Sequence, residues 1–309
     1  MDFDEDLYRA LRHDGRAAHS TLAARLGVDR SLISQRLHHL RQTGQLKIVA
    51  VIHPRLLGLS VQAHLMLSIQ GPTDCVFEEL RRIDSVAYLS ETTGPTQAVA
   101  EVWARSTHDL GVSLNRIRTV GGVSSMHVTY YDQVLRTLML GEEPETTDIG
   151  FDDLDLAIIQ NLQRDGRMTF GEMQRRTGAA ASTCRKRMQR LVTLRVVQIG
   201  GIRGRGAGDK GLLFGVGVDC AGDSATAEAV EKSLTSLPGL EFTARTMGRF
   251  THVATIGVRS LEEYNDVVRD LRGIPGVRSA ETWIHAAVWA ERYDWSLERL
   301  DPRKKWKSE

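Results

Sequence analysis

The sequence repeats itself, and this repeat constrains the fold more than any other feature. Leu-Arg-His-Asp-Gly-Arg at 11–16 returns as Leu-Gln-Arg-Asp-Gly-Arg at 162–167, a shift of 151 residues. At that shift, apolar residues of the first copy fall on apolar residues of the second: Phe3 on Leu154, Leu7 on Ile158, Leu11 on Leu162, Leu37 on Met188 and Leu40 on Leu191. A later block returns at a shift of 154, since Ser106 corresponds to Ser260. Because self-similarity of this kind is the signature of a repeated structural unit, we predict a tandem duplication.

The composition bounds the class of protein. With 309 residues, 41% of them hydrophobic and 26% charged, the chain is typical of globular proteins with several domains. The formal net charge is only +1, so nucleic-acid binding must depend on where the charges lie. Residues 2–6 are rich in acid where a secretory leader would be basic, and no apolar run is long enough to span a bilayer. We therefore expect a cytoplasmic protein without a membrane partner.

The pattern of the three cysteines argues against a fold held together by disulfide bonds or by a structural zinc ion. Cys75, Cys184 and Cys220 are odd in number, lie far apart and form no CxxC pair. Disulfide frameworks and structural zinc sites need closer or paired cysteines. We expect buried, inert thiols, and the sequence predicts neither a metal nor a cofactor.

Each copy divides into a helical block followed by a mixed block, and an acidic segment without lysine or arginine separates the copies. A Gly-rich stretch at 200–211 is predicted to be a hinge within the second copy. The expected domains are a helix-turn-helix at 1–50, a sensor at 51–140, an acidic linker at 141–150, a second helix-turn-helix at 151–199, a second sensor at 200–295 and a basic tail at 296–309.

The first block of each copy has the spacing of three short helices. Phe3, Leu7 and Leu11 recur every four residues, and a second helix should end at Gly27. A third helix places its apolar residues at 33, 37 and 40 on one face. Three short helices with a glycine turn before the third indicate a helix-turn-helix.

The opposite face of each third helix carries groups suited to DNA. Hydroxyl, amide and basic side chains can read base edges or contact phosphates, and no carboxylate interrupts them. In the first copy the candidate DNA-binding residues are Arg30, Ser31, Ser34, Gln35, Arg36 and His38; in the second they are Ser182, Thr183, Arg185, Lys186, Arg187 and Gln189. The second helix is the more basic, so we expect it to contribute more of the phosphate affinity.

The second block of each copy alternates between strand-like and helix-like patterns. Residues 61–69 place apolar and polar side chains on alternate faces, as a half-buried strand does. Further strands are expected at 86–92, 98–104, 123–131, 211–218, 240–247, 252–258 and 277–289, and helices at 74–83, 107–119, 224–236 and 260–273. The predicted fold class is α+β, with two winged helix-turn-helix domains, each followed by a βαββαβ ferredoxin-like sensor domain.

These residues resemble the Lrp/AsnC family of transcription regulators over nearly the whole chain, twice. The helix-turn-helix signature of the family is similar to Asp14–Arg16, Leu22–Gly27 and Arg36–Leu40, followed by Gly44 and a strand that closes at His53-Pro54. The sensor module of the family, called RAM, resembles the βαββαβ blocks. The resemblance implies double-stranded DNA as partner, homo-oligomers formed through sensor sheets, and an amino acid or related metabolite bound at the sensors.

The same resemblance implies an effector loop between the second and third sensor strands. The candidate effector contacts are Thr93, Gly94, Gln97, Gly248, Arg249 and Thr251. The family normally has an Asp three residues after the glycine, and here Gln97 and Thr251 occupy that position. The acidic partner expected for an ammonium group is therefore missing from both loops.

The duplication leaves the mode of pairing open. The two sensors could pair within one chain as a pseudo-dimer, or each could pair with the matching sensor of another chain. In either case the two third helices differ chemically, so we predict an asymmetric DNA operator.

Two other functions fit the same domain plan. Siroheme decarboxylases are similar in plan, and basic residues that could hold an acidic tetrapyrrole are Arg203, Arg205, Arg245, Arg249, His252 and His285. A scaffold that has lost DNA binding is the other alternative. The basic and amide-rich third helices favour a DNA-binding transcription regulator that is not an enzyme.

Overall fold

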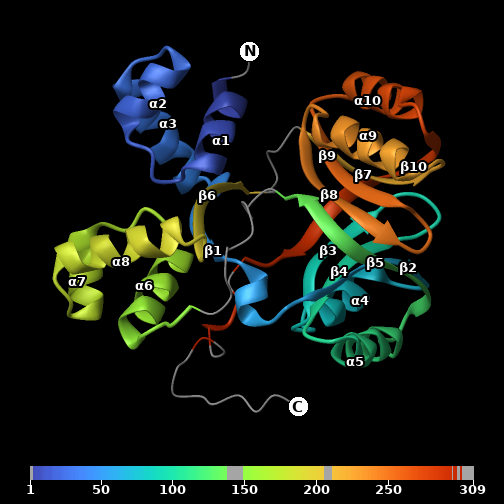
Figure 1. The fold of residues 1–309 in the computed structure, drawn as a ribbon, viewed down its shortest axis with the longest axis horizontal. Helices are drawn as coiled ribbons and strands as arrows, with labels where there is room; N and C mark the ends of the chain where they lie inside the picture. Colours follow the sequence, from blue (N-terminus) through green and yellow to red (C-terminus); the bar gives the residue numbers. More distant parts are fainter. Residues whose placement is uncertain (1–2, 138–148, 205–210, 294, 298–299, 301–309) are drawn as a thin grey trace. The chain divides into compact units, whose positions relative to one another are not determined.

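The computed structural model describes residues 3–137, 149–204, 211–293, 295–297 and 300 (Figure 1). The same order of elements, three helices and a strand followed by βαββαβ, occurs twice along the chain. The chain divides into two compact units, and each unit takes a part from both copies. One unit contains Met1–Leu57, Met139–Asp209 and Tyr293–Glu309, and the other contains Gly58–Leu138 and Lys210–Arg292.

The first unit contains two three-helix heads, as the spacing of apolar residues predicts. The first head comprises α1 (Phe3–His13), α2 (His19–Leu26) and α3 (Arg30–Gln42), and the second comprises α6 (Asp153–Arg164), α7 (Phe170–Thr177) and α8 (Ala181–Thr193). The apolar stripe of α1 is fully buried at Leu7 and Leu11. Gly27 ends α2 in the left-handed conformation at φ 66°, and Gly178 ends α7 in the same way at φ 75°.

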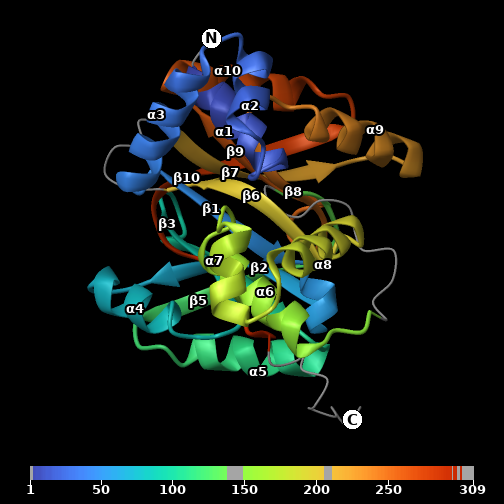
Figure 2. The same cartoon turned by 90° about the vertical axis from the view of Figure 1, so that its left-hand side faces the viewer.

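One strand from each head joins the two heads (Figure 2). β1 (Leu46–Ile52) pairs antiparallel with β6 (Val197–Arg203), and Val49 lies opposite Gly200, its own counterpart at a shift of 151. The heads are therefore related by a pseudo-two-fold axis through this pair. Each head supplies one strand instead of the hairpin expected of a winged domain.

The expected domain boundaries after residues 50 and 199 fall inside these two strands, β1 and β6. The predicted hinge is wrong at 200–203, because these residues belong to β6. Most of the rest of that glycine-rich stretch, most of the expected acidic linker and nearly all of the basic tail lie outside the described residues.

The second unit contains both βαββαβ blocks, which confirms the predicted sensor fold. A short 3₁₀ helix, η1 (Pro54–Leu57), precedes it in the chain. The first block is β2 (Val61–Ile69), α4 (Thr73–Leu80), β3 (Val86–Thr92), β4 (Ala98–Ala104), α5 (Thr107–Arg118) and β5 (Val123–Arg136). The second is β7 (Leu212–Cys220), α9 (Ser224–Thr235), β8 (Leu240–Met247), β9 (His252–Val258), α10 (Leu261–Gly273) and β10 (Val277–Glu291). The change in shift from 151 to 154 occurs between β7 and β8, where α9 replaces the shorter α4.

The eight strands form one closed sheet in the order β10-β3-β4-β2-β5-β8-β9-β7. β5 and β10 are longer than predicted, because each pairs first within its own block and then with the other block. The two sensors therefore pair within one chain. Every strand of this sheet already has two neighbours, so no strand edge remains for pairing with another chain. Homo-oligomer formation stays a prediction.

Two outer cores and one inner cluster hold the closed sheet together. α4 and α5 cover the outer face of one half, and α9 and α10 cover that of the other half (Figure 1). We call the apolar residues between the two halves the inner cluster: Met66, Tyr88, Val99, Tyr131, Val134, Phe242, Ala244, Phe250, Val253 and Trp283. Strand side chains alternate between these two environments, as a sheet with two buried faces requires.

The cysteines only partly follow the sequence prediction. Cys184 is buried and Cys220 is partly buried, but Cys75 is exposed on α4. The expectation of a buried thiol is therefore wrong for Cys75. Among the described residues, no helix is both long enough and apolar enough to cross a membrane.

Candidate functional site

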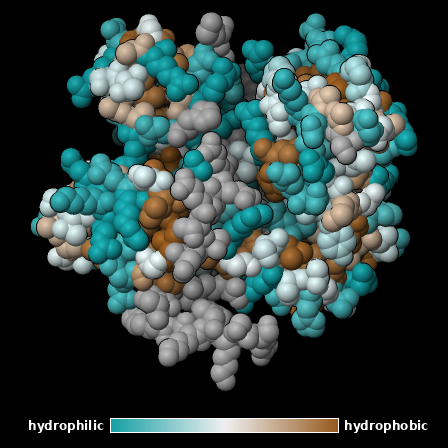
Figure 3. Space-filling model, in the orientation of Figure 1, coloured by the Kyte–Doolittle hydropathy of each residue, from teal (hydrophilic) through white to brown (hydrophobic). Residues whose placement is uncertain are grey.

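The exposed faces of α3 and α8 are the surface on which the structure gathers most of the predicted DNA-binding residues. The exposed residues are Arg30, Ser31, Ser34, Gln35 and His38 on α3, and Ser182, Thr183, Arg185, Lys186 and Gln189 on α8. The helices are anchored from below by Ile33, Leu37 and Leu40 and by Cys184 and Leu191, all of them buried. Figure 3 shows hydrophilic side chains gathered over the outer side of α8.

Two of the predicted residues, Arg36 and Arg187, are turned toward their own heads. The Arg36 guanidinium pairs with both carboxylate oxygens of Asp4, and Nε lies 2.7 Å from Oδ1. At the equivalent place in the second head, Arg187 lies 3.1 Å from Asp155 and 2.8 Å from Asp152. These pairs bind the third helix of each head to the first, and the DNA contacts of both arginines stay a prediction.

Asp155 is the centre of the ion network in the second head. Its side chain is only 1% exposed, and it receives Arg190 at 3.2 Å in addition to Arg187. The nearby carboxylates, with Asp155 first, raise the pKa of Arg187 above its ordinary value. Asp155 also completes a capping box with Asp152 at the start of α6. The internal ion network of the second head therefore includes more residues than the Arg36–Asp4 pair of the first.

Arg185 is held in place by an aromatic ring. Its guanidinium carbon lies 5.0 Å from the centre of the Phe170 ring, at the start of α7, and that of Arg16 lies 5.0 Å from the same ring. A guanidinium near an aromatic face gains cation–π attraction and loses rotamer freedom. In the first head the equivalents are Ser34 and His19, so this arrangement exists only in the second.

The repeated Asp-Gly-Arg motif has a role that the sequence did not reveal. Gly15 N donates to Ile199 O at 2.9 Å, and Gly166 N donates to Ile48 O at 2.7 Å, so each motif binds the strand of the other head. Arg16 donates to Gly166 O and Met168 O, and Arg167 donates to Ala17 O. Burial lowers the pKa of both guanidinium groups.

Only glycine fits at the two turns of this contact. A Cβ on Gly15 would lie 2.8 Å from Ile48 and 3.0 Å from the Gly200 backbone, and a Cβ on Gly166 would be equally crowded. The sequence indicated the importance of this motif, because Asp-Gly-Arg is the best-preserved part of the repeat. The partner strand of each motif, however, lies more than 110 residues away in the chain.

The two predicted effector loops lie where each sensor block meets the last strand of the other block. In the first loop, Thr93 N donates to Ile284 O at 3.0 Å, and Gly94 has a positive φ of 109°. In the second, Gly248 has a φ of 144°, and an added Cβ would lie 3.3 Å from Thr129 Cα. The loops are thus at the junctions between blocks, at two separate places.

Several side chains of these loops hold the fold. Gln97 Oε1 accepts a hydrogen bond from Ile69 N at 2.9 Å, and Thr251 Oγ1 accepts one from Cys220 N at 3.0 Å. These two pairs are equivalent in the repeat, so both side chains are engaged by the backbone of the neighbouring strand. Arg249 lies 2.8 Å from Glu281.

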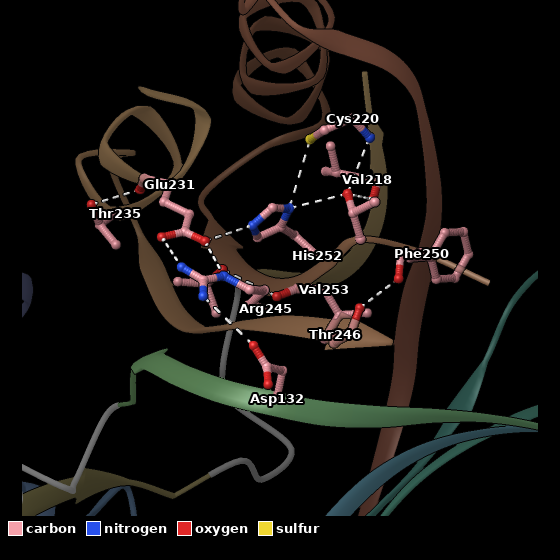
Figure 4. A network of polar contacts seen from close by, with 12 residues as sticks. Asp132, Val218, Cys220, Glu231, Thr235, Arg245, Thr246, Phe250, His252 and Val253 are labelled. Carbon is pink, nitrogen blue, oxygen red and sulfur yellow. Dashed lines mark hydrogen bonds and ion pairs between the residues drawn. The ribbon is translucent and has the colours of Figure 1, made fainter. Parts of the chain in front are cut away.

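A polar network specific to the second sensor lies beside the second loop (Figure 4). Arg245 binds Glu231 through Nε at 2.6 Å and through a terminal nitrogen at 2.9 Å, and reaches Asp132 at 3.6 Å. His252, 2% exposed, contacts the same Glu231 at 3.1 Å and lies 3.6 Å from the Cys220 sulfur. Hydrogen bonding to Arg245 lowers the pKa of Glu231, and burial raises that of Cys220. The network joins α9 to four strands, β5, β7, β8 and β9, and leaves the Arg245 cation neutralised.

The described residues considered for tetrapyrrole binding belong to two different units, and each has a protein partner. Arg203 belongs to β6 in the unit of the heads, where it pairs with Glu5 at 3.1 Å, whereas Arg245 and His252 lie in the sensor unit on Glu231. His285 is buried and lies 2.9 Å from Ser90 Oγ. Arg249 is paired as described above, and Arg205 lies outside the described residues. In the part of the chain that the structure describes, no three His, Cys, Asp or Glu side chains are grouped so that they could hold a metal ion.

Comparison with family models identifies both parts of the second copy. Residues 151–192 match the AsnC-type helix-turn-helix domain, and residues 214–293 match the Lrp/AsnC ligand binding domain. These ranges coincide with the second head and the second sensor described above.

Some known proteins resemble about half of this chain in sequence, and others resemble the whole chain in fold. The HTH-type transcriptional regulator FL11 of Pyrococcus horikoshii is 25% identical over 150 residues, which are 48% of this chain and 94% of that protein. An uncharacterized HTH-type transcriptional regulator of Pyrococcus abyssi is 30% identical over 143 residues, 45% of this chain and 89% of that protein. The crystal structure of the siroheme decarboxylase NirDL covers 97% of this chain and 96% of its own, with a TM-score of 0.63 and 13% identity.

These findings differ in what they establish. The NirDL likeness, at 13% identity, concerns the fold of the whole chain alone. Each Pyrococcus regulator, in contrast, is matched over nearly its entire length by about half of this chain. Together with the two family models, these matches show that the chain belongs to the Lrp/AsnC family.

Proposed function

We propose that this chain is a DNA-binding transcription regulator whose two unlike heads bind one asymmetric operator. The observation that carries this proposal is the reciprocal joining of the heads through β1, β6 and the two Asp-Gly-Arg turns. Because both third helices belong to one rigidly paired unit, they are offered to DNA as a pair from a single chain. Half-sites on DNA are then read at a spacing that the protein fixes.

The heads differ in the kind of contact that they offer. On α3 the exposed residues are mainly hydroxyl, amide and imidazole groups, whereas α8 presents Arg185 and Lys186 at the places of Ser34 and Gln35. Phosphate contacts supply salt-dependent affinity, and base-edge contacts supply sequence preference. The second head therefore supplies more of the affinity for DNA phosphates. The first head contributes to sequence preference through neutral side chains that contact base edges.

The test is salt-dependent binding of the full chain to its own upstream intergenic DNA, compared with a scrambled duplex of the same composition. Loss of two phosphate contacts in Arg185→Ala with Lys186→Ala should reduce the slope of log affinity against log salt by about two. A matched control is Arg269→Ala with Arg272→Ala, which removes two cations from α10 in the sensor unit. The control should leave the slope unchanged.

Equal, weak binding of the wild type to both duplexes would contradict the proposal. So would equal loss of slope in the double variant and in its control, because binding would then follow net charge and not the α8 surface. A symmetric operator, in which both half-sites have the same optimum sequence, would contradict the asymmetry.

We propose that the sensor loops bind a small-molecule effector, such as an amino acid or related metabolite, that changes DNA binding. The loops lie at the junctions between blocks, where a ligand can alter the pairing of two strands. Thr93, Gly94, Gly248 and Arg249 are the candidate contacts, with Gln97 and Thr251 already engaged by backbone. A regulator of this kind acts where DNA is, and the cytoplasm is the proposed location.

The siroheme decarboxylase alternative has less support. An acidic tetrapyrrole needs cations that are not already neutralised, but Arg245 and Arg249 are paired with Glu231 and Glu281. A tetrapyrrole-binding assay follows if specific DNA binding fails. The function that the geometry supports best is regulation without catalysis.

A further inference from the structure

The inner face of the closed sheet carries a polar group within its apolar packing. Glu101 on β4 and His64 on β2 lie directly opposite each other in the strand register. Both alternate with inner-cluster residues of the same strands, Val99 and Met66, so they share that face. Tyr131 from β5 reaches the same place and donates its hydroxyl to Glu101 Oε1 at 3.0 Å.

Glu101 is an acid that has no cationic partner among the residues that the structure describes. The groups that act on its carboxyl are the Tyr131 hydroxyl, the Glu291 carboxylate and the Trp103 indole, and none of them is positively charged. Burial is the main effect, and it raises the pKa of Glu101 to about 7. A buried carboxylate is normally paired, because the unpaired charge is costly.

His64 supplies a second and independent sign that something is missing. Its side chain is 4% exposed, and among the described residues Nε2 has no hydrogen-bond partner. Burial lowers its pKa to about 4, so the ring is neutral near pH 7 and can offer a lone pair. An unpartnered buried nitrogen costs free energy that a ligand could recover. The ring centre lies 5.6 Å from that of Trp283 and 6.5 Å from that of Tyr131.

The polar group belongs to one half of the sheet only. At the equivalent places in the second sensor, Gly215 replaces His64 and Thr255 replaces Glu101. Gly215 leaves room for the Trp283 indole, which an added Cβ would strike. The inner face therefore has the Trp283 ring on the side of the second block and the polar pair His64 and Glu101 on the side of the first.

Solvent still reaches parts of this inner face. Tyr88, Glu101, Trp103 and Tyr131 are only partly buried, although their neighbours in the inner cluster, Met66, Val99 and Trp283, are at most 4% exposed. Aromatic surface next to an acid and a neutral imidazole is the composition of a site for an organic cation.

We propose that this inner face binds a primary ammonium ligand with an apolar tail. The ammonium donates to the Glu101 carboxylate and to His64 Nε2, and the rings of Tyr131 and Trp283 stabilise its charge. The tail packs against the partly exposed side chains of the inner cluster, such as Tyr88 and Phe242. A ligand that also carries a carboxylate is disfavoured, because Glu101 and Glu291 would repel it. The site therefore prefers amines to amino acids.

The test is calorimetric titration of the full chain, without DNA, at about pH 8, where Glu101 is ionised. Phenethylamine is the probe, 2-phenylethanol is its neutral counterpart, and phenylalanine carries the additional carboxylate. We expect one phenethylamine per chain, with both other compounds at least tenfold weaker, a difference of about 1.4 kcal/mol. Nitrogen NMR of the imidazoles should show a change at His64 Nε2 when the amine binds.

Variants separate a specific site from simple charge attraction. Glu101→Gln keeps the shape of the side chain and should weaken phenethylamine binding at least tenfold, whereas Glu91→Gln, which removes a carboxylate from the adjacent strand, should not. Absence of saturable binding to the wild type would overturn the proposal, as would equal affinity for 2-phenylethanol or equal loss in both variants. Because DNA is absent, none of these outcomes bears on the proposed operator binding.

Discussion

Substitution of Gly166 by alanine tests whether the two heads are held together by the Asp-Gly-Arg turns. Gly166 N donates to Ile48 O at 2.7 Å across the head junction. The new Cβ would lie 2.8 Å from Ile199 Cγ2 and 3.0 Å from both Ile48 O and Val49 N. Two of these three neighbours are backbone atoms of a paired strand, which cannot rotate away. Since Gly166 has no positive φ, the effect should come from crowding alone.

The magnitude follows from three opposing contributions. Crowding of a packed contact costs about 1–3 kcal/mol. Weakening of the hydrogen bond to Ile48 costs up to about 1 kcal/mol more. Alanine restricts the unfolded chain and returns about 0.4–1 kcal/mol. We therefore expect Gly166→Ala to lower the free energy of unfolding by about 1–3 kcal/mol.

The assay is guanidinium unfolding of the full chain, followed by far-ultraviolet circular dichroism. Gly171→Ala is the matched control, because Gly171 lies within α7 and an added Cβ would meet no atom within 4 Å. Helix propensity predicts that this control is more stable than the wild type by up to about 1 kcal/mol. If Gly166→Ala proved as stable as Gly171→Ala, the reasoning about the head junction would be refuted.

Three further results are expected. Asp155→Ala should lower stability by about 1–3 kcal/mol in thermal unfolding, since it leaves the partly exposed Arg187 without its buried partner, and an unchanged melting temperature would contradict this. The folded chain holds the Glu101 proton more tightly than the unfolded chain, so stability should fall as pH rises from about 5 to 8, and Glu101→Gln should flatten this part of the curve. Ser260→Ala and Ser106→Ala each remove a helix cap and should each cost about 0.5–2 kcal/mol in denaturant unfolding; a loss at one site alone would show that the two caps are not equivalent.

The helices and most strand boundaries could be predicted because their signals are local. Apolar residues four apart predicted the helix α1, and the alternation of apolar and polar residues predicted the strand β2 with the ends that the structure shows. The serines that helped to define the repeat prove to be helix caps, which explains why Ser106 and Ser260 occupy equivalent places.

What could not be predicted depends on partners that are distant in the sequence. The last residues of β5 and β10 form strand only because β8 and β3 of the other block lie beside them. A helix period alone also does not show that Asp4 and Asp155 pair with Arg36 and Arg187. Glu101 stands in an otherwise apolar strand, and that contrast was a signal that sequence reasoning passed over.

The joining of the two heads within one chain makes head assembly a first-order event. When two separate chains must meet, the paired form disappears on dilution, and its amount depends on the square of the monomer concentration. Here the strands β1 and β6 find each other inside one molecule, so the pair persists at any expression level. A few copies per cell suffice to keep every molecule in its two-headed form, and occupancy of DNA then rises in simple proportion to the number of chains.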